Sequence, residues 1–167
     1  RLVEIHKDKS GENYAVGDIY LGKVKKIIPG LNAAFIDVGY EKDAFLHYLD
    51  LGSQILSLNR FTKIALSGKK ERLGLEDFHL EKDIEKTGKI SGILHASQQI
   101  LVQVAKEPIS TKGPRVSSDL SFAGRYMVLV PFSDKVSVSQ KIKNPEERVR
   151  LKRLTLSIRP KNFGIIV

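Results

Sequence analysis

Two phenylalanines, Phe35 and Phe45, lie on neighbouring predicted strands and could stack against other planar rings. The stretch NAAFIDVGYEKDAFLHY, residues 32–48, predicts a β-hairpin that turns about Tyr40. Symmetric pairing about Tyr40 makes the two phenylalanines direct cross-strand neighbours. Aromatic side chains on a sheet surface form the platform on which the bases of single-stranded nucleic acid stack.

The alternation of side chains along a strand decides which face of the hairpin carries the two rings. The predicted core set is small and aliphatic: Ile36 opposite Ala44, and Ala34 opposite Leu46. The predicted outward set comprises Ala33, Phe35 and Asp37 opposite His47, Phe45 and Asp43. The preceding strand carries Lys23, Lys25 and Lys26, whose charges suit phosphates. The alternative is that a second layer of structure covers both rings and makes them part of the core.

The composition limits the partners of the protein more than its fold. The chain has 167 residues, 41% of them hydrophobic, which is enough for one domain or two small ones. Its net charge of +9 favours an acidic partner such as nucleic acid. The chain has no cysteine, which excludes disulfides and cysteine metal sites and agrees with a reducing compartment. No apolar run approaches the ~18 residues of a membrane-spanning helix, and no signal peptide is visible.

Five predicted strands have the order expected of an OB-type barrel. Gly17–Ile28 is the first strand, with Gly22 suited to a bend or bulge. The hairpin supplies the second and third strands, and Ile100–Ala105 and Arg115–Phe122 supply the fourth and fifth. Residues 49–99 form an enlarged excursion between the third and fourth strands, with a short polar helix predicted over Glu76–Lys86.

A second unit with a β-β-α-β pattern follows the barrel. The strands Tyr126–Pro131 and Val136–Ser139 are predicted to form a hairpin through residues 133–135. Asn144, Pro145 and two glutamates are a strong helix start, and the helix is predicted to run to about Ser157. We expect Leu151, Leu154 and Ile158 on its buried face and a final strand over Phe163–Val167.

These stretches together resemble the N-terminal part of the ribonuclease E/G family, bacterial endoribonucleases that process ribosomal RNA and messenger RNA. The resemblance is carried by GDIYLGKVKKIIPGLNAAFIDVGYEKDAFLH, ILVQVAKEPISTKGPRVSSDLSFAGRYMVLVPF, VSVSQKI and NFGIIV. The first block is similar to S1 RNA-binding domains in general, whereas the second is specific to the family. The resemblance implies an S1 domain (OB-fold) over residues 17–122. This domain would be inserted into a non-catalytic ribonuclease-H-like α/β subdomain made of residues 1–16 and 123–167.

The resemblance also implies roles for individual residues. Phe35 and Phe45 match S1 aromatics that hold single-stranded RNA, and Lys112, in the TKG loop, matches a basic residue that supports RNA binding. Gly124 and Val128 match positions that shape the pocket for the 5′-monophosphate of the RNA. In the family, an Arg-Thr pair that grips this phosphate follows the GIIV strand.

The same resemblance implies what a full-length enzyme contains. Its catalytic aspartates bind Mg²⁺ in a nuclease domain and its cysteines bind Zn²⁺, and both lie further along the family's sequences. Neither metal is therefore expected in this chain, which we expect to be inactive as a nuclease by itself. The full-length protein is expected to be cytoplasmic and a homo-oligomer.

The residues themselves show no convincing catalytic grouping. Asp37, Asp43 and Asp50 are close in sequence and could suggest a magnesium site. Two carboxylates beside stacking aromatics would, however, repel phosphate unless Lys42 or another cation offset them, so we interpret them as surface charges. The four histidines lack metal-ligand spacing, and no P-loop or nucleophile elbow is present. We therefore expect this chain to bind RNA without cutting it.

Two functions remain open at this point. The first is the RNA-binding, 5′-end-sensing part of an endoribonuclease that acts in rRNA processing and mRNA decay. The second is a stand-alone S1-type RNA-binding protein that acts in translation and has no enzymatic activity. The segment AGRYMVLVPF favours the first, because a free S1 module has no use for it. The strand-like residues at both ends, Arg1–Lys7 and Phe163–Val167, agree with it because they predict a piece of a longer chain.

Overall fold

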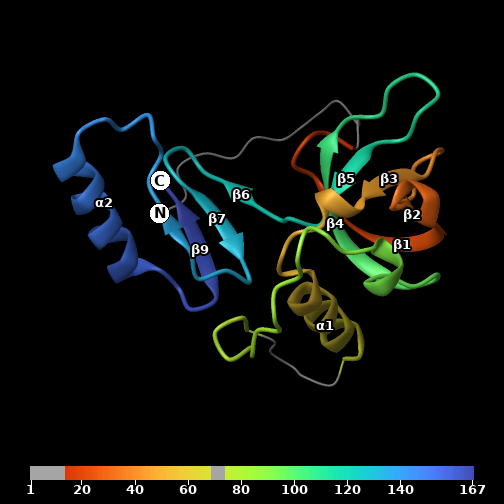
Figure 1. The fold of residues 1–167 in the computed structure, drawn as a ribbon, viewed down its shortest axis with the longest axis horizontal. Helices are drawn as coiled ribbons and strands as arrows, with labels where there is room; N and C mark the ends of the chain where they lie inside the picture. The colour runs from red at the N-terminus through yellow and green to blue at the C-terminus, as the bar shows by residue number, and fades with distance from the viewer. Residues whose placement is uncertain (1–13, 69–73) are drawn as a thin grey trace.

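The computed structural model describes residues 14–68 and 74–167, which form two β-sheets with helices beside them (Figure 1). The first sheet is a closed barrel of β1 (Ile19–Ile28), β2 (Ala33–Asp37), β3 (Ala44–His47), β4 (Gln99–Lys106) and β5 (Arg115–Ser117). The second contains β6 (Phe122–Ala123), β7 (Val128–Pro131), β8 (Val136–Ser137) and β9 (Phe163–Ile166). The strand predicted over residues 1–7, and most of the predicted subdomain segment 1–16, lie outside the described residues.

The strand order around the barrel is β1-β2-β3-β5-β4, with β3 and β5 parallel and the other neighbours antiparallel. This is the arrangement predicted for an OB-type barrel. Inward side chains such as Ile36, Leu46 and Val102 are fully buried. Gly22 lets β1 approach β2, because a Cβ at this position would lie 2.5 Å from Cγ2 of Ile36. The register of β1 shifts at Lys25, so the irregularity predicted for this strand is found there rather than at Gly22.

The excursion between β3 and β4 begins with the short 3₁₀ helix η2 (Tyr48–Asp50) and continues with α1 (Ile55–Leu66). The buried face of α1 carries Ile55 and Leu58, which are part of the same hydrophobic core as the barrel. A second 3₁₀ helix, η3 (Ile90–Gly92), leads back towards β4. In Figure 1, α1 lies beside the open end of the barrel rather than between its strands.

The prediction of a helix over Glu76–Lys86 is wrong, since these residues form an extended, irregular segment beside α1. Their backbone groups bind outside the segment instead of to one another. Glu81 N donates to Ser57 Oγ of α1 at 2.8 Å, and Ile84 N donates to the carbonyl oxygen of Ser53 at 2.8 Å. Tertiary hydrogen bonds therefore replace the helical ladder that the polar composition predicted.

The strand predicted over Arg115–Phe122 is also shorter in the structure, because β5 ends at Ser117. Beyond this point the side chain of Gln103 takes the place of a neighbouring strand. Its Nε2 donates to the carbonyl oxygen of Ser121 at 2.9 Å, and its Oε1 accepts from Ser121 N at 2.9 Å. The chain then leaves the barrel and enters the four-stranded sheet at β6.

The strand order of the second sheet is β6-β7-β9-β8, so the predicted hairpin of β7 with β8 is wrong. Strand β9 lies between them, antiparallel to β7 and parallel to β8. Gly164 permits this insertion, because a Cβ there would lie 2.8 Å from Ser133 Oγ and 2.9 Å from the carbonyl oxygen of Lys135. The loop between β7 and β8 therefore passes close over β9.

Helix α2 (Pro145–Ile158) confirms the predicted helix start. The side chain of Asn144 accepts hydrogen bonds from Glu146 N at 2.9 Å and from Glu147 N at 3.2 Å. The buried face of the helix differs from the prediction: Thr155 is 3% exposed, whereas Leu154 is 49% and Ile158 is 56% exposed. Within the described residues, no helix is long and apolar enough to cross a membrane.

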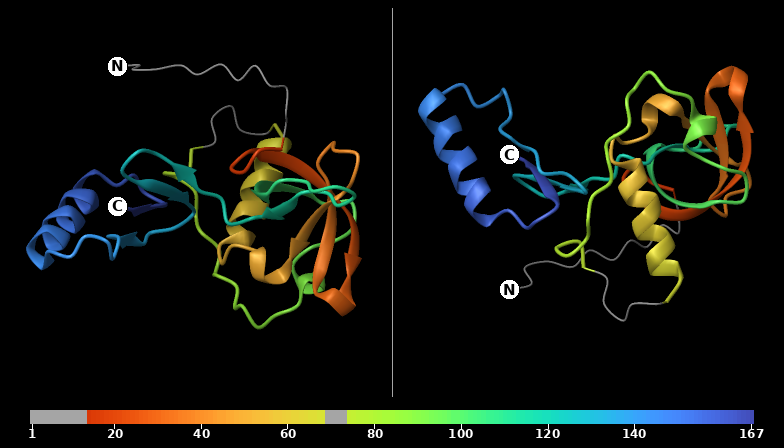
Figure 2. Two further views of the ribbon diagram at one scale, coloured as in Figure 1. Left: turned by 90° about the horizontal axis from the view of Figure 1, so that it is seen from above. Right: turned by 60° about the horizontal axis from the view of Figure 1, so that its bottom comes forward.

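A cluster of three phenylalanines joins the second sheet to the excursion. Phe61 of α1, Phe78 of the extended segment and Phe132 after β7 contact one another edge to face, with ring centroids 5.4–5.9 Å apart. Asn162, before β9, adds hydrogen bonds from Nδ2 to the carbonyl oxygens of Leu75 at 2.6 Å and of Phe78 at 2.7 Å. We call Phe61, Phe78, Phe132 and Asn162 the aromatic joint. Both views in Figure 2 show the second sheet beside the barrel, with α2 on the far side of that sheet.

Candidate nucleic-acid interface

Phe35 and Phe45 are opposite each other on β2 and β3, as predicted. Their ring centroids are 5.9 Å apart and their planes are inclined at 66°. Both side chains are partly exposed, whereas Ala34, Ile36 and their partners on β3 are fully buried. The described residues therefore leave the two rings accessible from outside the barrel, and no second layer makes them core.

The outward face of the hairpin is otherwise mostly polar. Ala33 is the exception, because it is fully buried at the end of the hairpin, where Tyr48 N donates to the carbonyl oxygen of Asn32 at 2.8 Å. Asp37 and Asp43 lie near the turn and share a cation, since Lys25 Nζ lies 2.8 Å from Asp43 Oδ1 and 4.0 Å from Asp37 Oδ2. The hydrogen bond and charge of Asp43 raise the pKa of Lys25. The offsetting cation is thus Lys25 rather than Lys42.

The two carboxylates form an ion pair with lysine and are not part of a metal-ligand cluster. Over residues 14–68 and 74–167, no three His, Cys, Asp or Glu side chains come together as a potential metal site. Asp50, the third aspartate considered, has a different partner. Its carboxylate binds Arg115 in a bidentate manner, with Nε 2.9 Å from Oδ2 and Nη2 3.1 Å from Oδ1.

The loop that carries Lys112 is fixed against the first residues of β3. Residues 109–112 form a tight turn with Ser110 at a φ of +52°, closed by two hydrogen bonds between Ile109 and Lys112. A Cβ at Gly113 would overlap the carbonyl oxygens of Lys42 and Asp43, so only glycine allows the loop to lie this close. Phe45 N donates to the carbonyl oxygen of Pro114 at 2.9 Å. The structure therefore brings exposed Lys112 to the same end of the hairpin as Phe45.

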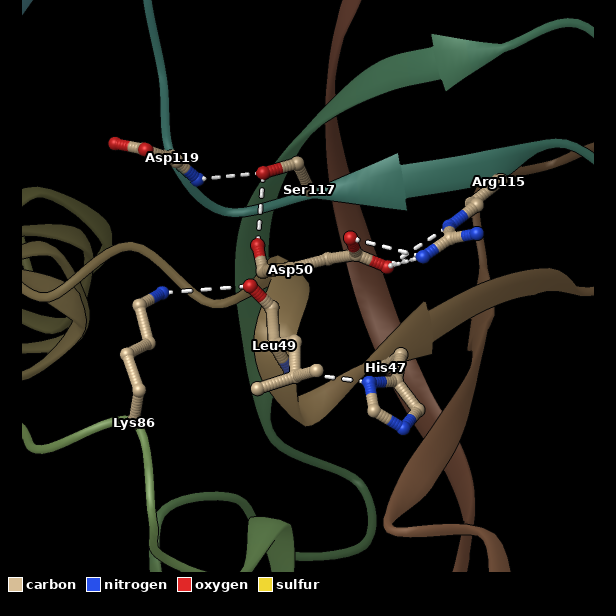
Figure 3. Close-up of polar contacts among 7 residues, drawn as sticks. All are labelled: His47, Leu49, Asp50, Lys86, Arg115, Ser117 and Asp119. Atoms are coloured by element: carbon tan, nitrogen blue, oxygen red, sulfur yellow. Dashed lines mark hydrogen bonds and ion pairs between the residues drawn. The ribbon is translucent and has the colours of Figure 1, made fainter.

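Arg115 and His47, both drawn in Figure 3, were not identified as site residues from the sequence. Arg115 pairs with Phe45 in the parallel bridge between β3 and β5, and His47 is two residues after Phe45 on β3. His47 Nδ1 accepts a hydrogen bond from Leu49 N at 3.1 Å, which leaves Nε2 as the nitrogen that carries the proton. The signal for His47 was present, because the alternation placed it in the outward set. Arg115 could not be found this way, since its neighbour comes from a strand distant in the sequence.

Figure 3 also shows what holds this side of the barrel in place. Ser117 Oγ donates to the carbonyl oxygen of Asp50 at 2.7 Å and accepts from Asp119 N at 3.0 Å. The ammonium of Lys86 donates to the carbonyl oxygens of Leu49 and Leu51. The chain after β3 is therefore bound both to β5 and to the excursion, which fixes the position of Asp50 beneath Arg115.

Gly124 and Val128 lie close together on the hairpin of β6 and β7. Gly124 N donates to the carbonyl oxygen of Met127 at 2.8 Å, and Val128 pairs with Ala123. Val128 lines a cleft of about 670 Å³ between the second sheet and the excursion, whereas Gly124 is not among its lining residues. The structure does not bring this hairpin next to Phe35 and Phe45, because β2 and β3 are on the side of the barrel away from the second sheet (Figures 1 and 2).

Comparison with known proteins identifies the family of this chain. The model of the Ribonuclease E/G family matches residues 121–167. Ribonuclease E of Synechocystis sp. is 40% identical over 153 residues, which cover 91% of this chain and 19% of that protein. Ribonuclease G of Escherichia coli (strain K12) is 32% identical over 166 residues, which cover 99% of this chain and 30% of that protein. The chain belongs to the ribonuclease E/G family.

These relatives in the ribonuclease E/G family are much longer than the chain itself, which spans 19% to 30% of their length. A third relative, Ribonuclease G of Haemophilus influenzae, is 37% identical over 153 residues, which cover 92% of this chain and 27% of that protein. The family model covers β6 to β9 and α2, whereas these relatives also align with the barrel. Both sheets are therefore part of the similarity.

Proposed function

We propose that this chain is the RNA-binding, 5′-end-sensing part of an endoribonuclease of the ribonuclease E/G type that acts in rRNA processing and mRNA decay. The observation that carries the proposal is the accessible pair of Phe35 and Phe45, with Lys26 beside Phe35 and Arg115 beside Phe45. In this arrangement the rings stack on bases, and Lys112 and neighbouring cations meet the phosphates. The match of residues 121–167 to the family model supports this function over a stand-alone S1 protein.

On this proposal, the two sheets bind different parts of the RNA. The barrel, as the S1-type domain, holds single-stranded RNA, and the hairpin with Gly124 and Val128 contributes to a pocket for the 5′-monophosphate. The second sheet belongs, on this proposal, to a ribonuclease-H-like subdomain. Cleavage, Mg²⁺ and Zn²⁺ belong to other parts of a full-length cytoplasmic homo-oligomer, so this chain alone does not hydrolyse RNA.

Binding of a fluorescent single-stranded RNA, followed by anisotropy, tests the central claim. Stacking contributes about 1–3 kcal/mol per base, so Phe35→Ala and Phe45→Ala should each weaken binding about tenfold or more. Leu66→Ala is the matched control, because Leu66 is a large apolar side chain that is 48% exposed on α1. Circular dichroism must show that each variant is folded. Unchanged affinity in a folded double variant of both phenylalanines would contradict the proposal.

The 5′-end claim requires a separate measurement with the full-length protein. We expect tighter binding of 5′-monophosphorylated RNA than of 5′-hydroxyl RNA of the same sequence. Val128→Asp should remove this difference, since a carboxylate would repel the phosphate. A preference that survives in the folded Val128→Asp protein would show that the pocket lies elsewhere.

A further inference from the structure

Strand β1 contains a β-bulge beside Phe35. Val24 pairs with Ile36 and Lys26 pairs with Phe35, so Lys25 and Lys26 together occupy the place of one residue. Without the extra residue, position 26 would share the inward face of Val24, which is 1% exposed. With it, Lys25 and Lys26 are both exposed, and the inward order resumes at Ile27, opposite Ala34. The bulge therefore puts two successive lysines on the face that carries the aromatic pair.

The two lysines have different surroundings. Lys25 is engaged with carboxylates: its ammonium is 2.8 Å from Asp43 and 4.0 Å from Asp37, and about half of its side chain is exposed. Asp37 is itself held in the turn, because its Oδ1 accepts from Gly39 N at 3.0 Å. Lys26 takes part in none of the ion pairs between described residues and lies directly beside Phe35.

Asp37 and Asp43 lie close enough to the two phenylalanines to affect the binding of RNA there. Asp43 directly precedes β3 and is two residues from Phe45, which corresponds to about 7 Å along an extended chain. This is within the Debye length of about 8 Å at physiological ionic strength, so an uncompensated carboxylate would repel a phosphate next to the rings. Asp37 is likewise two residues from Phe35, on β2.

We propose that the bulge gives the two lysines separate tasks: Lys26 contacts the phosphate backbone of RNA stacked on Phe35, and Lys25 neutralises Asp37 and Asp43 so that the RNA can approach. This inference rests on the proposed function. It adds a positioning role for Lys25, which supports RNA binding without contacting the RNA. Lys25 acts through the carboxylates, whereas Lys26 acts on the ligand itself.

A double-mutant cycle of Lys25→Ala and Asp43→Asn tests the role of Lys25 by RNA binding at low salt. Lys25→Ala alone should weaken binding about threefold, in the range of surface charge interactions. Asp43→Asn alone should leave the affinity equal or slightly higher, and the double variant should bind like the wild type. An equal loss on Lys25→Ala in both backgrounds would overturn the inference, because Lys25 would then contact phosphate directly.

The salt dependence of binding tests the role of Lys26. Lys26→Ala should reduce the slope of log affinity against log salt by about 0.7, the value for one phosphate contact with a single strand. The Lys25→Ala/Asp43→Asn double variant should keep the wild-type slope. Lys63→Ala is the control for loss of an exposed lysine, since Lys63 lies on α1. An unchanged slope in Lys26→Ala would overturn its assignment.

The controls separate the failure of this inference from that of the proposed function. Thermal unfolding shows whether each variant keeps the wild-type fold, and Lys25→Gln replaces Lys25→Ala if the alanine disturbs the bulge. Binding by the wild type with additive effects of Lys25 and Asp43 would contradict the inference alone. Absence of binding by the wild type would overturn the proposed function and the inference with it.

Discussion

The barrel and the second sheet differ in how completely they bury their side chains. Inward residues of the barrel, such as Ile36, Leu46 and Ile100, are 0% exposed. In the second sheet Ile165 is 3% exposed, but Val128 and Val130 are only half-buried and Ile166 is 44% exposed. Helix α2, which covers one face of that sheet, leaves Val149 59% exposed.

The closure of the barrel explains why its side chains are more completely buried than those of the second sheet. A closed barrel has no edge strands, and its core combines side chains from the strands with Ile55 and Leu58 of α1. The second sheet is open and has strands of two to four residues; α2 covers one side, and the cleft lies on the other. It is fixed to the rest of the chain through the aromatic joint. A sheet this small depends on its neighbours for stability more than the closed barrel does.

The largest loss of stability is expected from a substitution in the aromatic joint. Phe132→Ala removes a ring that is 5% exposed and contacts two others, at a cost of about 3–5 kcal/mol in the free energy of unfolding. Native-state hydrogen exchange should show loss of protection in β7 and β9 first, with protection in the barrel strands retained. Phe122→Ala is the control, because Phe122 is 49% exposed. Equal loss of protection in both sheets would contradict the comparison.

A somewhat smaller effect is expected in the barrel core. Leu46→Ala should lower the free energy of unfolding by about 2–5 kcal/mol, because it leaves a cavity among fully buried side chains. The matched change in the second unit, Leu154→Ala, removes a side chain that is 49% exposed and should cost about 0.5 kcal/mol or less. Urea denaturation followed by circular dichroism measures both. Similar losses would mean that Leu154 is buried in solution by something that the described residues do not supply.

The smallest effect concerns the start of α2. Asn144→Ala removes the side chain that accepts from Glu146 N and Glu147 N and should cost about 1 kcal/mol. Asn144→Asp keeps the acceptor and should restore most of the loss, also because a negative charge is favourable at a helix N-terminus. Thermal unfolding compares the two variants. If alanine and aspartate had the same effect, the cap would not contribute to the stability of the second unit.

Two elements whose partners are close in sequence, the hairpin of β2 and β3 and the start of α2, were predicted correctly. The hairpin of β2 and β3 has the predicted register, which placed Phe35 and Phe45 together, and α2 begins at the predicted cap. The predicted apolar face of α2 was wrong for an understandable reason. Leu151, Leu154 and Ile158 follow a helical period, but so do Arg148, Leu151 and Thr155, and only the sheet decides which of the two faces is covered.

The sequence alone determined what local physics controls: alternation along strands, turn residues, the helix cap and the cationic surroundings of the two rings. The tertiary structure decided what depends on partners distant in the chain. The segment 76–86 is extended because Ser57, Ser53 and Tyr48 bind its backbone groups. Strand β9 lies between β7 and β8 because Gly164 allows close passage. The bulge at Lys25 follows from pairing with β2, and no periodicity within β1 encodes it.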